Sequence, residues 1–335
     1  MSARGEASER PPVGSDGFAT NSRDVNERSI RSVLRSAFIE AHSAKLRATG
    51  EFARLIAAPR VHFVYLHHAF EDEVTNFRRT LEEIGRTHQF VTYSKAVELV
   101  YSGKIDRPYA CVSFDDGLKT TLRASRVMDE LGISGCFFVC PAIVGEPDRE
   151  MVRRFAETRL RYPPMDVLTW QDIDSMLARG HEIGSHTFSH PNMGEVSVEQ
   201  AIDELQLSAE ALRRRIGGVK HFAWPSGKWA NFSARAGKAV FDLGYESCAS
   251  AIRGCHMPRT FGVKPRDVCF RREHIMGSWP LHHNMYFLAR SVLLASGNDY
   301  EWPSAWQSIV RTERHPVAAA STSGAGGAML ALPAH

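Results

Sequence analysis

Short apolar runs that are typical of buried strands alternate with amphipathic helical patterns over most of this chain. The predicted strands are His62–Leu66, Phe90–Tyr93, Ala110–Phe114, Gly135–Val139, His181–Ser185, His221–Trp224 and Glu246–Ala249. The predicted helices between them are Asn76–Gly85, Ser94–Ser102, Thr120–Leu131, Trp170–Arg179, Ser197–Ile216 and Ser233–Leu243. Such alternation indicates parallel βαβ units and therefore an α/β fold, which could be a barrel or a doubly wound sheet.

Two adjacent carboxylates, Asp115 and Asp116, come directly after one predicted strand, and two histidines, His186 and His190, follow another. In α/β proteins the catalytic groups lie at these carboxyl ends of strands. The four-residue spacing of the histidines lets both imidazoles bind one cation, and Pro191 predicts a tight turn there in place of a long helix. One Asp and two His leave a coordination position open for water or substrate, which is typical of a catalytic metal site.

Each of these motifs has a simpler interpretation when it is taken alone. An Asp-Asp-Gly triplet is often only a turn, and a pair of histidines is often solvated or hydrogen bonded. Adjacent carboxylates that are partly buried need a counter-charge, which a divalent cation supplies. Because all four groups fall at strand ends of one α/β pattern, we expect a joint metal site.

Three motifs occur in a fixed order, namely Ser113–Gly117, Ser185–His190 and Phe222–Gly227. In this order and spacing they resemble the polysaccharide deacetylase family, the NodB-homology domain of carbohydrate esterases that remove N-acetyl groups from amino sugars. The resemblance extends over residues 59–280 and includes the opening strand Tyr65–His68. It implies an incomplete (β/α)7 barrel that is similar to a distorted TIM barrel.

The resemblance and the ligand types together predict a site for amide hydrolysis. Asp116, His186 and His190 are the expected ligands of a divalent metal, with zinc the expected ion. Asp115 is the expected general base. The substrate-binding loop is expected to comprise Trp224, Pro225, Ser226 and Gly227, with a backbone N–H for the oxyanion. Trp224 is expected either to stack on the sugar or to pack in the core.

Two departures from the family pattern leave roles open. Many members have an Arg in the third motif that orients the base, but Ala223 stands there in this chain, so another group must orient Asp115. The late Leu-x-Leu-His motif, whose His protonates the leaving amine, is not found. His67, His68 and His274 are candidates for that general acid, and we favour His67 because it ends the opening strand.

The expected activity is removal of an N-acetyl group from an amino sugar in a polysaccharide, oligosaccharide or glycolipid. The alternatives are metal-dependent hydrolysis of a C–N bond outside sugars and peptides, and a catalytically weak glycan-binding module of the same fold. The intact set of two Asp and two His argues against a pure binding module.

Composition agrees with an enzyme that has one principal domain. The 335 residues are 43% hydrophobic and 24% charged, and a net charge of +3 gives no reason to expect a nucleic-acid partner. Residues 1–26 contain no apolar stretch that could be the core of a signal peptide, and no segment approaches the apolar length of a membrane span. The six cysteines form no Cys-x-x-Cys pair. We therefore expect reduced thiols and a cytoplasmic protein, and the sequence does not indicate an oligomeric state.

The segments that flank the principal domain have their own patterns. Residues 1–26 are predicted to be disordered, and residues 281–313 to form a C-terminal helical extension. Residues 27–58 are predicted to form a helical appendage, because helical periodicity is found over Asp24–Leu55. The Ala/Gly/Ser-rich residues 314–335 are predicted to be a disordered tail. Pro147–Asp166 interrupts the alternation and is predicted to be a loop over the cleft.

Overall fold

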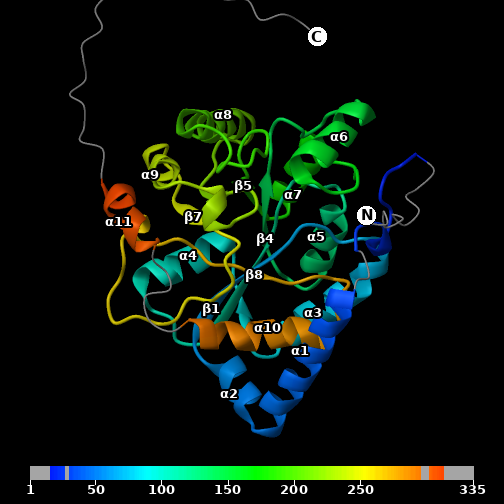
Figure 1. Cartoon of the computed structure of the whole chain (residues 1–335), viewed down its shortest axis with the longest axis vertical. Coiled ribbons are helices and arrows are strands. Elements are labelled where there is room, and N and C mark those ends of the chain that lie inside the picture. The colour runs from blue at the N-terminus through cyan, green and yellow to red at the C-terminus, as the bar shows by residue number, and fades with distance from the viewer. Residues whose placement is uncertain (1–15, 27–29, 296–301, 313–335) are drawn as a thin grey trace, which may run out of the picture.

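Eight parallel strands form the centre of the molecule (Figure 1). The structure is a computed structural model that describes residues 16–26, 30–295 and 302–312. The strands are β1 (Arg60–Leu66), β2 (Gln89–Phe90), β3 (Pro108–Phe114), β4 (Gly135–Val139), β5 (Glu182–Ser185), β6 (His221–Ala223), β7 (Ser247–Ala249) and β8 (Glu273–His274). Their order is β7-β6-β5-β4-β3-β1-β8, with β2 beside β3. Because neighbours from β3 to β7 follow the chain without reversal, the fold is an incomplete (β/α)7 barrel and not a doubly wound sheet.

The segment around β8 connects the two ends of this curved sheet. Phe270 donates its N–H to the Cys248 carbonyl of β7 at 2.9 Å, and β8 then pairs with β1 in the register Val64↔Glu273. Ile275 N–H donates to the Tyr65 carbonyl at 3.2 Å. The sequence analysis does not predict β8, because it has only two residues and charged neighbours.

Side chains alternate between the inside of the barrel and the surrounding layer of helices, as the period of two in a strand requires. Phe63 of β1, Phe138 of β4 and Phe270 belong to the inner cluster, in which the Phe63 and Phe270 rings lie 5.0 Å apart. Val64 and Leu66 point the other way and pack in the larger cluster with the helices. Residues two positions from Phe63 along β1 therefore point towards the barrel axis. The side chains that directly follow each strand lie at its carboxyl end.

The helices between the strands lie close to their predicted positions. They are α3 (Glu71–Gly85), α4 (Tyr93–Ser102), α5 (Thr121–Glu130), α7 (Trp170–Ala178), α8 (Val198–Ile216) and α9 (Ala234–Asp242). The helix α3 begins earlier than predicted, because the Glu73 carboxylate accepts the Phe70 N–H at 2.9 Å and so starts the helix at Glu71. The predicted strand Phe90–Tyr93 is wrong at its end, because Thr92 caps α4 by accepting the Lys95 N–H.

The segment predicted as a loop over the cleft, Pro147–Asp166, contains helix as well. The helix α6 (Arg149–Phe155) continues into a π-helical turn, η2 (Ala156–Leu160). After η2 the chain returns to the barrel, where Leu168 N–H donates to the Gly117 carbonyl at 2.9 Å. The segment is therefore helical over residues 149–160 and irregular over residues 161–166, so the prediction of a loop holds for only part of it.

The N-terminal part of the chain packs against this segment. Residues 16–26 contain the 3-10 turn η1 (Ser22–Asp24), and the side chains of Phe18 and Ala19 are buried. Ala19 N–H donates to the Pro164 carbonyl at 2.8 Å. The prediction of disorder is therefore wrong for residues 16–26, because two apolar side chains find a buried site, and residues 1–15 lie outside the described residues.

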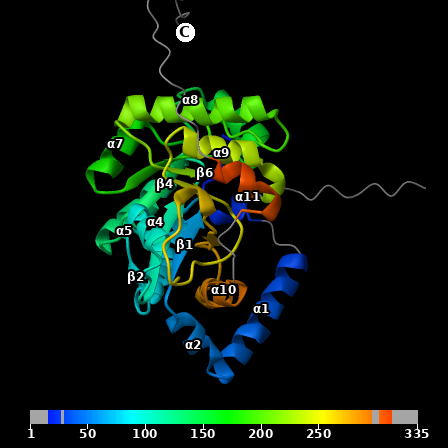
Figure 2. The same cartoon turned by 90° about the vertical axis from the view of Figure 1, so that its left-hand side faces the viewer.

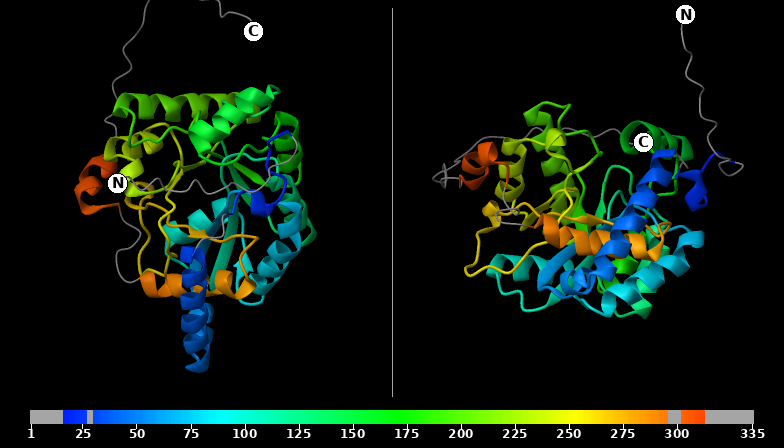
Figure 3. Two further views of the ribbon diagram at one scale, coloured as in Figure 1. Left: turned by 45° about the vertical axis from the view of Figure 1, so that its right-hand side comes forward. Right: turned by 60° about the horizontal axis from the view of Figure 1, so that its bottom comes forward.

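The predicted N-terminal helix is two helices, α1 (Ile30–Ala48) and α2 (Glu51–Ala57), which meet at Gly50 with a φ of 70°. They form a V against the outside of the barrel, with α10 (Leu281–Leu294) between them (Figure 2). Figure 3 shows α10 beside α1 from two further directions. The extension ends with α11 (Ser304–Arg311) against α9, and residues 314–335 lie outside the described residues.

Two general predictions can be compared with the described residues. No helix among them combines the length and the apolar character that crossing a membrane needs. All six cysteines are free and buried, as expected for core thiols rather than a disulfide framework.

Candidate active site

A cavity of about 180 Å³ opens at the carboxyl ends of the strands. It brings together five residues that the sequence places far apart: His67 after β1, Asp115 and Asp116 after β3, and His186 and His190 after β5. The rest of its lining consists of Tyr65, Leu160, Tyr162, Trp224, Ser226, Gly227, Ala251 and Arg272. Eight of the nine predicted site residues, all except Pro225, therefore line one cavity, because parallel strands end at the same rim.

Asp116, His186 and His190 form a possible metal site. The Oδ1 atom of Asp116 lies 3.4 Å from Nε2 of His186 and 3.3 Å from Nε2 of His190. All three side chains are buried, and their ligand atoms lie within 4.8 Å of one another. Both distances exceed those of a good N–H···O hydrogen bond, while three donors at this spacing suit a cation placed between them.

Both imidazoles are oriented by backbone carbonyl groups on their far side. The Nδ1 atom of His186 lies 2.8 Å from the Ala223 carbonyl of β6, and Nδ1 of His190 lies 3.2 Å from the Arg159 carbonyl in η2. Since a carbonyl only accepts, each Nδ1 carries the proton and donates it. Each Nε2 lone pair is then directed towards Asp116. In metal-binding histidines the nitrogen that does not bind the metal typically donates such a hydrogen bond to a carbonyl or carboxylate.

The backbone at the cavity adopts left-handed conformations that non-glycine residues rarely occupy. Asp116, Thr187, His190 and Ser226 have φ angles of 75°, 65°, 54° and 62°. His190 N–H is held by the Thr187 hydroxyl at 3.0 Å, so the segment turns tightly, as predicted. Each such residue costs on the order of 1–3 kcal/mol, and such strain is typical of functional sites.

Arg272 orients Asp115, and the sequence analysis missed it. The guanidinium donates from Nη1 to Oδ1 of Asp115 at 2.7 Å and from Nη2 to Oδ2 at 2.8 Å. Its Nε donates to the Ser250 carbonyl at 2.8 Å, and its Cζ lies 4.4 Å from the centre of the Tyr65 ring. This two-point contact supplies the positive neighbour that Ala223 cannot. The signal in the sequence was that Arg272 lies between two short apolar segments, Val268 to Phe270 and Ile275 to Met276.

The electrostatics of the two carboxylates follow from these contacts. Burial alone would raise the pKa of Asp115, but the charge and hydrogen bonds of Arg272, together with His186 and His67, outweigh burial and lower it. Burial likewise opposes ionisation of Asp116, and its contacts with His186 and His190 lower its pKa well below the usual value. For His186, burial is outweighed by the carboxylates of Asp115 and Asp116, which raise its pKa. The site therefore has a negative potential that favours a cation.

The three candidate histidines for the general acid lie in different surroundings. His67 lines the cavity, whereas the Nδ1 atom of His68 lies 3.1 Å from Oε2 of Glu73 in α3. His274 does not line the cavity and packs between the rings of Tyr65 and Trp279. Burial lowers the pKa of His274 well below its usual value, so it stays neutral. Of the three, only His67 faces the two carboxylates.

The predicted substrate-binding loop is only partly exposed to the cavity. The Trp224 side chain is 0% exposed and stacks on Phe232 with 4.5 Å between ring centres. Of the two alternatives for Trp224, packing in the core is the one found, because Phe232 stacks on its ring and Trp302 lies beside it. Pro225 is buried and does not line the cavity, so it is not a contact residue either.

Ser226 and Gly227 do line the cavity. Gly227 has a φ of 59°, and its carbonyl accepts the Ala251 N–H at 2.9 Å. A Cβ atom at this position would lie 2.2 Å from Ala251. Only glycine permits this approach of the two chains.

Residues 102–248 match the model of a protein family described as polysaccharide deacetylase. A search of the curated proteins gives no match. The match contains Asp115, Asp116, His186 and His190, and it ends before Arg272.

Three solved structures show the same fold. IcaB from Ammonifex degensii is 17% identical with a TM-score of 0.54, and the match covers 69% of this chain and 98% of IcaB. The Streptococcus pyogenes deacetylase PplD is 14% identical with a TM-score of 0.53 over 69% of this chain and 98% of PplD. BC0361, a polysaccharide deacetylase from Bacillus cereus, is 16% identical with a TM-score of 0.52 over 68% of this chain and 69% of BC0361.

Proposed function

We propose that this chain belongs to the polysaccharide deacetylase family, whose model matches residues 102–248, and that it is a metal-dependent hydrolase of N-acetylated amino sugars. The substrate would be a polysaccharide, an oligosaccharide or a glycolipid. The observation that carries the proposal is the convergence of Asp115, Asp116, His186 and His190 in one cavity. A glycan-binding module would not need two buried carboxylates and two oriented imidazoles.

Asp116, His186 and His190 would hold the metal ion, and zinc fits their mixed carboxylate and imidazole donors. Three protein ligands leave a position for a non-protein ligand. When bound, the cation would polarise the acetyl carbonyl and lower the pKa of a coordinated water to about 7. The carbonyl groups of Ala223 and Arg159 keep the two imidazoles in the tautomer that ligation requires.

Asp115 would act as the general base. Its carboxylate lines the cavity next to Asp116, and Arg272 fixes both of its oxygens. Because Arg272 keeps the pKa of Asp115 below its usual value, Asp115 is ionised at neutral pH and can accept a proton from the attacking water.

His67 would protonate the leaving amine. It enters the cavity from the end of β1, on the same rim as the two carboxylates. Burial lowers its pKa, and the charges of Asp116 and Asp115 oppose this effect. The backbone N–H groups near Gly227 would stabilise the oxyanion, since a glycine without a side chain lets the backbone approach the substrate closely.

The test is product analysis with the metal-loaded protein. A panel of N-acetylated glucosamine oligomers, an N-acetylated polysaccharide and simple cyclic and linear amides would be incubated with the protein, and free acetate and free ammonia would be measured. We expect acetate from the N-acetyl sugars, and release slower by about two to four orders of magnitude from an Asp115→Asn variant. Ammonia from the amides with no acetate from any sugar would assign the site to a non-sugar C–N hydrolase.

A further inference from the structure

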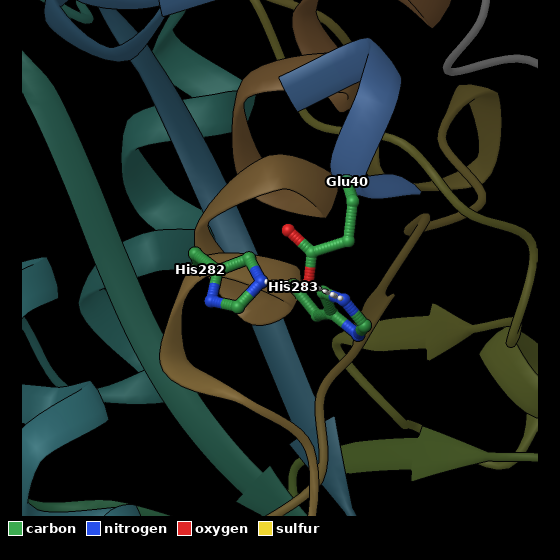
Figure 4. A group of neighbouring side chains, drawn as sticks. All are labelled: Glu40, His282 and His283. Atoms are coloured by element: carbon green, nitrogen blue, oxygen red, sulfur yellow. Dashed lines mark hydrogen bonds and ion pairs between the residues drawn. The ribbon is translucent and has the colours of Figure 1, made fainter. Parts of the chain in front are cut away.

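A second cluster of metal-binding side chains lies outside the barrel, where α1 meets α10. Glu40 of α1 extends its carboxylate between the imidazoles of His282 and His283, which belong to the first turn of α10 (Figure 4). The Oε1 atom of Glu40 lies 2.6 Å from Nε2 of His282 and 3.2 Å from Nε2 of His283. The three ligand atoms lie within 4.8 Å of one another.

This cluster has the same kinds of ligand as the cavity trio on an unrelated part of the molecule, although here the carboxylate lies at hydrogen-bond distance from both imidazoles. In both places two Nε2 atoms converge on one carboxylate oxygen, here on Oε1 of Glu40 and in the cavity on Oδ1 of Asp116. Two imidazoles and one carboxylate are a donor set for borderline transition metals and not for Mg²⁺ or Ca²⁺. We propose that Glu40, His282 and His283 bind a divalent transition-metal ion, such as Zn²⁺, that ties the N-terminal helices to the barrel.

The backbones that carry the three ligands are held in place by packing. His283 is almost fully buried, and the next residue, Asn284, donates from Nδ2 to the Met276 carbonyl at 3.0 Å. On α1, Ile39 beside Glu40 is buried, and His42 packs edge-on against Tyr286 of α10 with 5.8 Å between ring centres. The two helices therefore hold the ligands near one another without any ion. Because the ligands are already in place, little conformational entropy is lost when an ion binds.

The cluster is also open enough for an ion to enter. The side chains of Glu40 and His282 are 56% and 40% exposed, whereas His283 is 5% exposed. In the part of the chain that the structure describes, Glu40 pairs with these two imidazoles and with no lysine or arginine. Its carboxylate charge therefore remains available to a cation, and water would complete the coordination.

An ion here would couple distant parts of the sequence, since Glu40 and His282 lie 242 residues apart. The hydrogen bonds alone contribute little at so exposed a position. A cation that needs all three ligands can bind only while α1 rests on α10, so it would stabilise the docked form by mass action. This inference is independent of the proposed function, because none of its residues lines the cavity.

The experiment uses the full chain without an affinity tag, with His186→Ala and His190→Ala substituted to remove the cavity site. Zn²⁺ alone would be titrated by calorimetry, and bound metal would be counted after dialysis. We expect about one Zn²⁺ per chain and a rise in melting temperature. Glu40→Gln or His282→Ala, both at exposed positions, should each weaken Zn²⁺ binding by at least about tenfold and abolish the rise in melting temperature.

Two matched controls separate ligation from packing. Glu51→Gln makes the same change on α2, and His42→Phe removes the ring nitrogens at a position on α1 outside the cluster while it keeps a ring against Tyr286. Both should bind Zn²⁺ like the parent. The proposal is overturned if the parent binds no Zn²⁺, or if Glu40→Gln and His282→Ala bind it as tightly as the two controls do.

Discussion

Arg272 and Asp115 lie 157 residues apart in the sequence and meet through two parallel hydrogen bonds of 2.7 and 2.8 Å. Both side chains are almost completely buried. A buried guanidinium that binds both oxygens of a carboxylate fixes the direction of the carboxylate as well as its charge. The position of the proposed base is thus set by a residue beyond all three sequence motifs.

Replacing Arg272 should affect both stability and the pH dependence of activity. In Arg272→Met, Asp115 is left buried without its partner, and we expect a loss of about 3–5 kcal/mol in the free energy of unfolding. Burial then raises the pKa of Asp115, so the acidic limb of the rate profile should move to higher pH. Denaturant unfolding and the pH–rate profile measure the two effects. An unmoved acidic limb would contradict this role of Arg272.

The pair also predicts how stability depends on pH. Because the folded-state pKa of Asp115 is lower than its unfolded value of about 3.9, the stabilisation is complete above that value and is lost as pH falls through the folded-state pKa. Acid unfolding of the wild type should therefore be steeper below about pH 4 than that of Arg272→Met/Asp115→Asn, in which both charges are gone. Parallel curves of unfolding free energy against pH would contradict this expectation.

The two adjacent carboxylates should separate in their effects on metal binding. In a His282→Ala background, which removes the outer site, Asp115→Asn should lower turnover by about two to four orders of magnitude while one metal ion per chain is retained. Asp116→Asn should also lose metal, because two imidazoles alone bind it far less tightly. Metal analysis and acetate release measure both. Equal metal loss in the two variants would show that the assigned roles are wrong.

His67 should control the alkaline side of the rate profile. His67→Ala should lower turnover and remove the alkaline limb while metal content stays unchanged, because the leaving amine loses its proton donor. His274→Ala is the matched control, since His274 contacts the His67 ring with 5.4 Å between ring centres but does not line the cavity. Loss of the alkaline limb in His274→Ala alone would assign the acid to His274.

A comparison of Gly227 with Gly180 tests the close contact between Gly227 and Ala251 at the cavity. Both have positive φ angles, 59° and 87°, but only an added Cβ at Gly227 meets neighbouring atoms. Gly180→Ala should cost about 1 kcal/mol of stability from backbone strain alone. Gly227→Ala should cost more and also reduce activity, because the chain must move away from Ala251. Equal free energies of unfolding for the two variants would show that the backbone can move away from Ala251 at no cost.

Local patterns in the sequence predicted much of the barrel and most of the site. Strand and helix periodicities located the parallel units, and Ser197 with Gln200 predicted the start of α8, where both capping hydrogen bonds are present. Asp116, His186 and His190 were found because each follows directly on a predicted strand. In a barrel, a position after a strand is enough to place a residue at the rim.

The missed features depend on contacts between distant segments. The strand that directly follows Arg272, β8, has two residues and becomes recognisable only through its pairing with β1. Trp224 lies at the expected strand end, but Trp302 from the C-terminal extension helps to cover it, which no local pattern could indicate. Residues 16–26 are polar in composition, and the burial of Phe18 depends on a site between α6 and the barrel.

The short segment from Phe270 to His274 has one more consequence, which concerns the order of events during synthesis. It is among the last parts of the barrel to leave the ribosome, and it both joins β7 to β1 and delivers Arg272 to Asp115. Until it docks, Asp115 either stays hydrated in an open sheet or, once buried without a counter-charge, binds a proton and cannot act as a base. The ability to hydrolyse substrate would therefore arise only when the ring of strands is complete. Chains in which this last segment has not yet docked would be inactive.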